Sequence, residues 1–210
     1  MKTDRREFII LGGAITLLAA SALSFGESIK PLVEDKEKKV ALIYATRYGA
    51  TQETSGWIAE GLERDVAMLN IEEMDFAKSV LEYDLFIIGS GVWIDGVHRD
   101  MIRFLKEYKA KLTGKIIASF ILCGTTGNDT KGEERIAQYF HKFHAPLDIK
   151  PSLNQKFGGR MIIDKLTPED RKLLENFYLK VLKREFVDWD RTEPDKAKIF
   201  AKEIAYTKFD

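Results

Sequence analysis

The sequence predicts an α/β fold in which helices cover both faces of a doubly wound, five-stranded parallel sheet. The first observation is a set of short runs rich in Ile, Leu, Val and Phe. These runs lack the alternation of a half-exposed strand, which is typical of strands buried on both faces. The second observation is that helical patterns separate the runs along the chain, which predicts strand-helix-strand units and therefore a parallel sheet.

Five strands account for this sheet. They are predicted at 40–45, 66–72, 85–88, 116–122 and 157–163. The first, third and fourth have continuous apolar runs, whereas the last is weakened by the pair Gly158-Gly159, because glycine has no side chain to pack in a strand.

Helices fill the segments between and after the strands. The first is predicted over 52–65, directly after the first strand. Four later helices each place apolar residues three and four positions apart, on one helix face. Thr167-Pro168 and Thr192 with Pro194 are typical helix starts for the last two. The four stripes are Met101, Ile102, Leu105 and Tyr108; Ile136, Phe140 and Phe143; Leu173, Leu174, Phe177 and Val181; and Ala197, Phe200, Ala201 and Ile204.

Composition predicts one main globular domain. The chain has 210 residues, of which 45% are hydrophobic and 31% charged. Lys+Arg and Asp+Glu are equal at 33 each, so no bulk positive field favours nucleic acid, and no nucleic-acid role is expected. Cys123 is the only cysteine, which excludes an intrachain disulfide.

The first 26 residues have a different character from the rest of the chain. Arg5-Arg6 followed by Glu7-Phe8-Ile9 resembles the twin-arginine export signature, and an uncharged apolar run follows over 8–25. We therefore predict an export signal or N-terminal anchor at 1–26, a charged linker at 27–38 and the folded domain at 39–210. The expected location is periplasmic, or anchored in the membrane and facing outside the cytoplasm, with membrane contact through the N-terminal segment.

The loop after the first strand is a candidate phosphate site. Hydroxyl groups, a glycine that lets the backbone come close, and the N–H groups of a helix start form a cradle for an anion. Arg47 could add positive charge. The alternative is an ordinary strand-to-helix turn with a threonine cap. The loop consists of Thr46, Arg47, Tyr48, Gly49, Ala50 and Thr51.

Two further loops follow predicted strands. In the second, at 89–96, Trp93 could stack on a flat ligand, and the alternative is a tryptophan packed on its own helix. The third, at 123–129, offers glycine amides and short polar side chains, and its alternative is a polar turn without a special role. The candidate residues are Ser90, Gly91, Val92 and Trp93 in the second loop, and Cys123, Gly124, Thr125, Thr126 and Gly127 in the third.

These loops all leave the carboxyl ends of parallel strands, so they lie at one edge of the predicted sheet. Ligands of such folds bind at that edge. Together they describe a slot for a flat, phosphorylated ligand with polar edges, which suggests flavin mononucleotide (FMN). Cys123 is expected to be a small buried filler beside the ring. His98 is expected to cap its helix or contact the loop, and His141 and His144 to be surface residues.

The motifs T-R-Y-G-A-T and Y-D-L-F-I-I-G-S-G-V-W resemble the flavodoxin family over about residues 39–205. The sequence is most similar to flavodoxin-like protoporphyrinogen oxidases that pass electrons to quinone. That similarity rests on T-R-x-G-x-T, on His98 at a helix start, and on Asp188-Trp189 followed by F-A-x-E-I at 200–204. The resemblance implies that the first loop holds the FMN phosphate and that the other two line the isoalloxazine. Tyr48 is expected to contribute only its backbone.

The predicted function is an exported FMN-binding redox protein that transfers electrons between a donor and a membrane or periplasmic acceptor. Quinone or a membrane redox protein would be the partner. Two alternatives stay open: an FMN-dependent, quinone-linked oxidoreductase similar to protoporphyrinogen oxidase, and a binding module that has kept the fold without flavin. No catalytic or metal-ligating residue is predicted.

Overall fold

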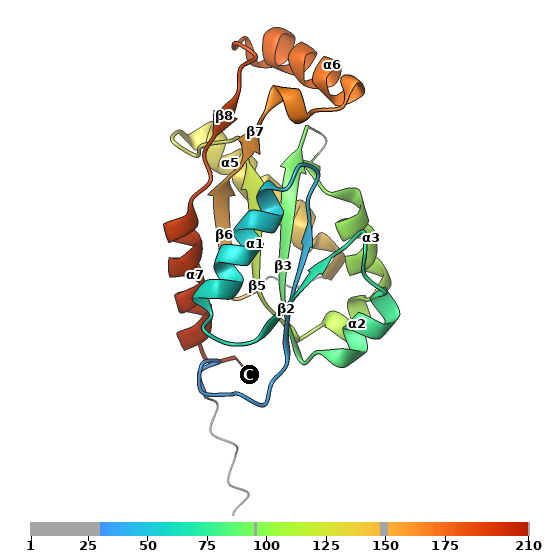
Figure 1. Cartoon of the computed structure of the whole chain (residues 1–210), viewed down its shortest axis with the longest axis vertical. Helices are drawn as coiled ribbons and strands as arrows, with labels where there is room; N and C mark the ends of the chain where they lie inside the picture. The colour runs from blue at the N-terminus through green and yellow to red at the C-terminus, as the bar shows by residue number, and fades with distance from the viewer. Residues whose placement is uncertain (1–29, 95, 148–150, 210) are drawn as a thin grey trace, which may run out of the picture.

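The structure is a computed structural model that describes residues 30–94, 96–147 and 151–209 (Figure 1). The predicted export signal at 1–26 lies outside the described residues. Within the described ranges, no helix is both long enough and apolar enough to cross a bilayer.

The predicted α/β fold with a five-stranded parallel core is confirmed. The sheet runs in the order β2-β1-β3-β5-β6, with every neighbouring pair parallel. Strand order therefore reverses at β1, because the chain moves to one side for β2 and to the other for β3. The strands are β1 (Val40–Ala45), β2 (Val66–Asn70), β3 (Leu85–Trp93), β5 (Ile116–Cys123) and β6 (Leu153–Gly158).

Helices pack on both faces of the sheet (Figure 1). On one face, α1 and α7 cover the strand residues Leu42 and Tyr44, and on the other, α3 and α5 cover Ala41 and Ile43. Successive residues of β1 thus enter opposite cores, which is why the strand is apolar throughout. The helices are α1 (Ala50–Gly61), α2 (Phe76–Glu82), α3 (Arg99–Glu107), α4 (Lys109–Leu112), α5 (Thr130–His144), α6 (Pro168–Asn176) and α7 (Pro194–Tyr206), with a 3-10 turn η1 (Ala145–Leu147) after α5.

Four strands differ from their predicted bounds: β2 ends two residues earlier, β5 ends one residue later, and the other two differ more. β3 does not end at residue 88 but continues to Trp93, where it turns back through the short antiparallel strand β4 (Gly96–Val97). β6 begins at Leu153, four residues before the predicted start, and stops at Gly158. The second candidate loop is therefore mostly strand and hairpin.

Residues 160–193 form a substructure, here called the cap, beyond the carboxyl ends of the strands (Figure 1). In the cap, β7 (Arg160–Met161) pairs with β8 (Trp189–Asp190), and the 3-10 turn η2 (Ile163–Lys165), α6 and the π-helix η3 (Phe177–Leu182) lie between them. The predicted helical stripe is present but only Leu174 is buried, whereas Leu173 and Val181 are exposed. The stripe does not face the main core.

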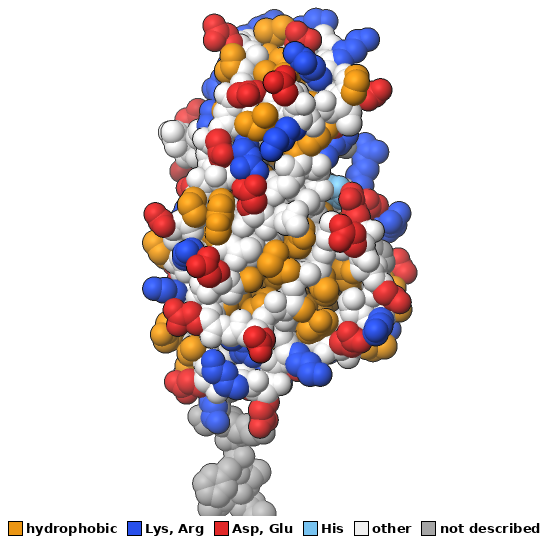
Figure 2. All heavy atoms as spheres, in the orientation of Figure 1, with side chains coloured by type: hydrophobic (Ala, Val, Ile, Leu, Met, Phe, Trp, Pro, Cys, Tyr) orange, Lys and Arg blue, Asp and Glu red, His pale blue; other side chains and the backbone are white. Residues whose placement is uncertain are grey.

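The opposite end of the domain holds the start of the described chain (Figure 1). Part of the predicted linker packs there: Leu32 is buried, and Val33 N–H donates to the carbonyl of Ala205. Arg64 Nη1 donates to the Leu32 carbonyl at 2.6 Å. Figure 2 shows apolar side chains gathered around the edge strand β2, where Met68 is half-exposed, with charged side chains of both signs around them.

Candidate functional site

The strand register brings the three candidate loops to one edge of the sheet. Ala45, the last residue of β1, lies opposite Ser90, and Gly91 lies opposite Leu122 on β5. The exits of β1, β3 and β5 are therefore neighbours, beside the reversal of strand order. The cap lies beyond this edge (Figure 1).

The first loop ends in a helix start without a side-chain cap. Gly49 is the N-cap of α1 with φ +87°, a left-handed conformation that glycine adopts without strain. Its N–H donates to Thr46 Oγ1 at 3.0 Å, which folds the loop back on itself. The N–H groups of Ala50, Thr51 and Gln52 have no intrahelical acceptor by the geometry of a helix start. This arrangement suits an anion.

Three other helices use side chains at the same position, whereas α3 and α7 have no side-chain cap. Asp75, Asp129 and Thr167 accept a backbone N–H at the starts of α2, α5 and α6. The start of α1 differs from these five in having a glycine at the N-cap position, so no N-cap side chain lies over its N–H groups.

The first and second loops pack closely. Thr51 is 3% exposed, and a Cβ added at Gly91 would lie 3.2 Å from Thr51 Oγ1. Ser90 is fully buried; its hydroxyl donates to the Gly91 carbonyl and accepts the N–H of His98. The Ser90 hydroxyl is thus used inside the hairpin, while Gly91 and Val92 are strand residues of β3.

Trp93 lies under two side chains of the first loop. The Arg47 guanidinium carbon is 4.5 Å from the Trp93 ring centroid, and the Tyr48 ring is tilted against it at 5.9 Å. The indole Nε1 is buried and has no hydrogen-bond partner among the described residues. An unpaired buried donor costs free energy, so this group fits a site that a ligand acceptor completes.

Arg47 and Tyr48 both reach the cap. Arg47 donates from Nε and Nη2 to the two carboxylate oxygens of Asp170, at 2.7 and 2.5 Å. The Tyr48 hydroxyl donates to the same carboxylate and accepts the N–H of Thr167 at 3.3 Å. The Tyr48 hydroxyl thus ties the loop to the start of α6, a contact that the sequence did not predict, and the expectation that Tyr48 contributes only its backbone to the phosphate site stays a prediction.

The third loop combines one buried residue with several accessible ones. Cys123 is buried as predicted, its Sγ lies 3.6 Å from the Thr125 carbonyl, and burial raises the pKa of the thiol. A thiol that stays neutral is a poor nucleophile, which supports its role as filler. Gly124 and Thr126 are exposed, Thr125 is half-buried, and Gly127 has φ +73° at the turn into α5.

The cap adds an aromatic residue that the loop sequences do not contain. Trp189 packs beside the third loop, where a Cβ added at Gly124 would lie 3.4 Å from the ring. Its Nε1 donates to the Tyr178 hydroxyl at 2.7 Å, and Arg191 lies over the ring at 5.1 Å. Arg191 also donates to the Gly124 carbonyl at 3.1 Å. In the sequence, only the Asp188-Trp189 motif indicated that Trp189 could belong to the site.

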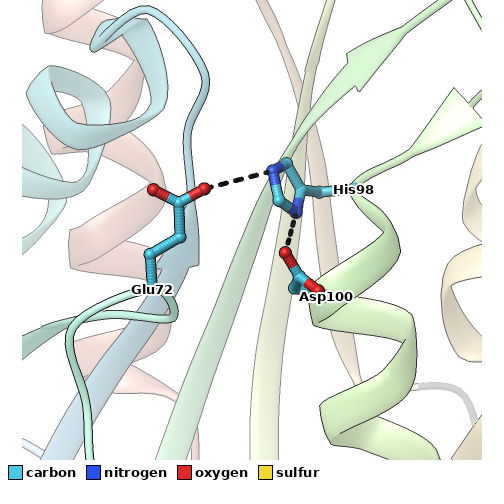
Figure 3. A group of neighbouring side chains, drawn as sticks. All are labelled: Glu72, His98 and Asp100. Carbon is cyan, nitrogen blue, oxygen red and sulfur yellow. Dashed lines mark ion pairs between the residues drawn. The ribbon is translucent and has the colours of Figure 1, made fainter.

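His98 lies between two carboxylates at the start of α3 (Figure 3). Its Nε2 is 3.8 Å from Glu72, and its Nδ1 is 3.9 Å from Asp100. The carboxylates face different nitrogens of the ring, and both distances are longer than a hydrogen bond. Of the two expected roles, capping α3 or contacting the loop, the side chain makes no capping hydrogen bond, and the backbone N–H contacts the second loop through Ser90.

The fold and these loops define a doubly wound α/β protein. Where its strand order reverses, the protein has a candidate anion site and, beside it, the aromatic residues Trp93 and Trp189. The sequence assigns the family: residues 41–186 match the Flavodoxin domain family, and the chain belongs to it. No curated protein matches this sequence.

Several solved structures are similar to this chain. Rubredoxin oxygen:oxidoreductase from Desulfovibrio gigas is 14% identical with a TM-score of 0.47, covering 84% of this chain but only 36% of its own. A flavodoxin WrbA-like protein from Agrobacterium tumefaciens is 13% identical with a TM-score of 0.48, covering 80% and 95%. A Fusobacterium nucleatum flavodoxin mutant bound to flavin mononucleotide is 18% identical with a TM-score of 0.41, covering 57% and 69%.

Proposed function

We propose that this protein binds FMN and, after export, transfers electrons between a donor and a membrane or periplasmic acceptor. The observation that carries the proposal is the helix start at Gly49, which no side chain caps and which lies in the same loop as the contacts to Trp93. When bound, FMN supplies the electron transfer, and the protein sets the position and surroundings of its ring.

The residues present fit this cofactor. Backbone N–H groups at 50–52 and the Thr51 hydroxyl would hold the phosphate, since a helix start favours an anion through its dipole and its N–H groups. Trp93 supplies an aromatic surface and a buried N–H in need of an acceptor. Gly124 and Thr126 are exposed, and their polar groups would contact the edge of the ring.

An absorption spectrum tests the proposal. The full-length chain, purified in mild detergent, is expected to retain FMN bands after desalting, or to gain them when FMN is added and excess is removed. Bands that stay with the protein would support a redox function and justify screening of quinones. A colourless protein that stays colourless with added FMN would overturn the proposal in favour of the flavin-free binding module.

Export is expected to depend on the arginine pair. Replacing Arg5-Arg6 by Lys-Lys should stop export of the chain, because the twin-arginine route reads both arginines and carries proteins folded, with cofactor already bound. Immunoblots of periplasmic, membrane and cytoplasmic fractions measure the distribution. The matched control replaces Lys2 by Arg, a charge-conserving change outside the pair, and should leave export unchanged. Normal export of the Lys-Lys variant would refute this route.

A second candidate is a quinone-linked oxidase similar to protoporphyrinogen oxidase. The observation that favours it is the aromatic group of the cap, in which Tyr178 contacts Trp189 and Phe186 beside the third loop. Such a surface suits a flat apolar substrate. Turnover of a porphyrinogen with added quinone would favour the enzyme, whereas reduction by protein partners without turnover would favour the carrier.

A further inference from the structure

Asp170 is a buried carboxylate that the cap brings to the first loop. It is 4% exposed and lies in the first turn of α6, after the N-cap residue Thr167. Its donors are Arg47, through two hydrogen bonds, and the Tyr48 hydroxyl. These donors and the positive end of the α6 dipole stabilise the charge of this buried carboxylate.

The same contact decides where Arg47 lies. The guanidinium is held on one side by Asp170 and covers the Trp93 ring on the other, at 4.5 Å from its centroid. Its side chain is 48% exposed, so water or a ligand can still reach it. Arg47 is therefore a partly accessible cation, in the loop proposed to hold a phosphate, whose charge is already paired with an internal anion.

We infer that Asp170 is a specificity-determining residue that competes with the phosphate of the flavin for Arg47. The inference rests on the proposed function, because it concerns a phosphate held at the start of α1. A phosphate in the first loop and the Asp170 carboxylate are like charges that share one guanidinium. Two anions that share one cation each gain less than either would gain alone.

The competition makes recognition of the phosphate weaker than the loop would otherwise allow. Removing the charge of Asp170 leaves Arg47 to the phosphate. The ratio of the dissociation constant of riboflavin to that of FMN isolates this effect, because riboflavin has the same ring and no phosphate. Changes in stacking on Trp93 affect both ligands and cancel in the ratio.

The test compares this ratio for wild type and Asp170→Asn, measured by quenching of flavin fluorescence in the full-length protein. Asparagine keeps the size of the side chain and one acceptor oxygen for Tyr48. We expect the ratio to rise about tenfold, the gain from one charge-assisted contact. In an Arg47→Gln background, adding Asp170→Asn should leave the ratio unchanged, because the cation under competition is gone.

Thr167→Ala provides the matched control. It removes the side-chain hydrogen bond at the N-terminus of α6, which should loosen residues 160–193 without changing the charge at Arg47. The ratio should stay at the wild-type value even where both flavins bind more weakly. A ratio that is unchanged or falls in Asp170→Asn, or that rises equally in Thr167→Ala, overturns the inference while the proposed function stands. If the wild type binds neither flavin, the proposed function fails and the inference fails with it.

Discussion

Replacing Gly158 by alanine is expected to lower the free energy of unfolding by about 3 kcal/mol, at the upper end of the usual cost of overpacking. A Cβ at this position would lie 1.9 Å from the Arg191 carbonyl oxygen, which is backbone and cannot rotate away. Gly158 N–H also donates to Glu193 at 2.6 Å, so the clash falls where the end of the cap joins β6. Urea unfolding followed by circular dichroism measures the loss.

Gly56→Ala is the control for this substitution. Gly56 lies in the middle of α1, and an added Cβ there meets no atom within 4 Å. Alanine should stabilise the protein by about 0.5–1 kcal/mol, because glycine is the poorer helix former. If Gly158→Ala unfolds at the wild-type urea concentration, the segment at Arg191 does not pack against β6 as described.

The sequence predicted the sheet because its signal is local. Val40–Ala45 is apolar at every position and is found with the predicted bounds, since each residue enters one of two cores. The start of β6 was missed because Leu153 is followed by polar residues. β6 is an edge strand whose first residues are half-buried, and such a strand has no continuous apolar run.

The position of the cap could not be predicted in the same way. The pattern of Leu173, Leu174 and Phe177 predicts a helix, but it does not say what the helix contacts. One contact that joins it to the first loop is the ion pair between Arg47 and Asp170, which are 123 residues apart in the chain. The local sequence does not distinguish a buried aspartate from an exposed one, so this contact could not be predicted from the hydrophobic pattern.

His144 shows the same limit within the domain. It was expected to be a surface residue because no third metal ligand was evident near His141 and His144, which are three positions apart on one helix. The structure overturns this, since His144 is 7% exposed and its Nε2 lies 2.8 Å from Ser119 Oγ on β5. Ser119 is itself fully buried in an apolar strand, and a hydroxyl in such a strand needs a partner. Ser119 was therefore the residue from which a buried polar partner such as His144 could have been predicted.

Replacing Trp93 by alanine is expected to weaken FMN binding about 10- to 100-fold, which corresponds to the loss of one aromatic stacking contact of about 1–3 kcal/mol. Trp93 is the aromatic residue at the exit of β3, beside the proposed phosphate loop. Alanine removes both the stacking surface and the buried indole N–H. Quenching of FMN fluorescence on titration with protein measures the dissociation constant.

Two variants separate stacking from general damage. Trp93→Phe keeps an aromatic face and should retain most of the affinity, with a smaller loss from the missing N–H. Trp57→Ala removes a tryptophan of α1 that packs against the core under α7, so it should reduce stability without a comparable loss of FMN affinity. Equal affinities for wild type and Trp93→Ala would remove Trp93 from the flavin site. Equal losses in Trp93→Ala and Trp57→Ala would mean that affinity follows the stability of the fold, because a specific contact at the exit of β3 predicts a loss for Trp93 alone.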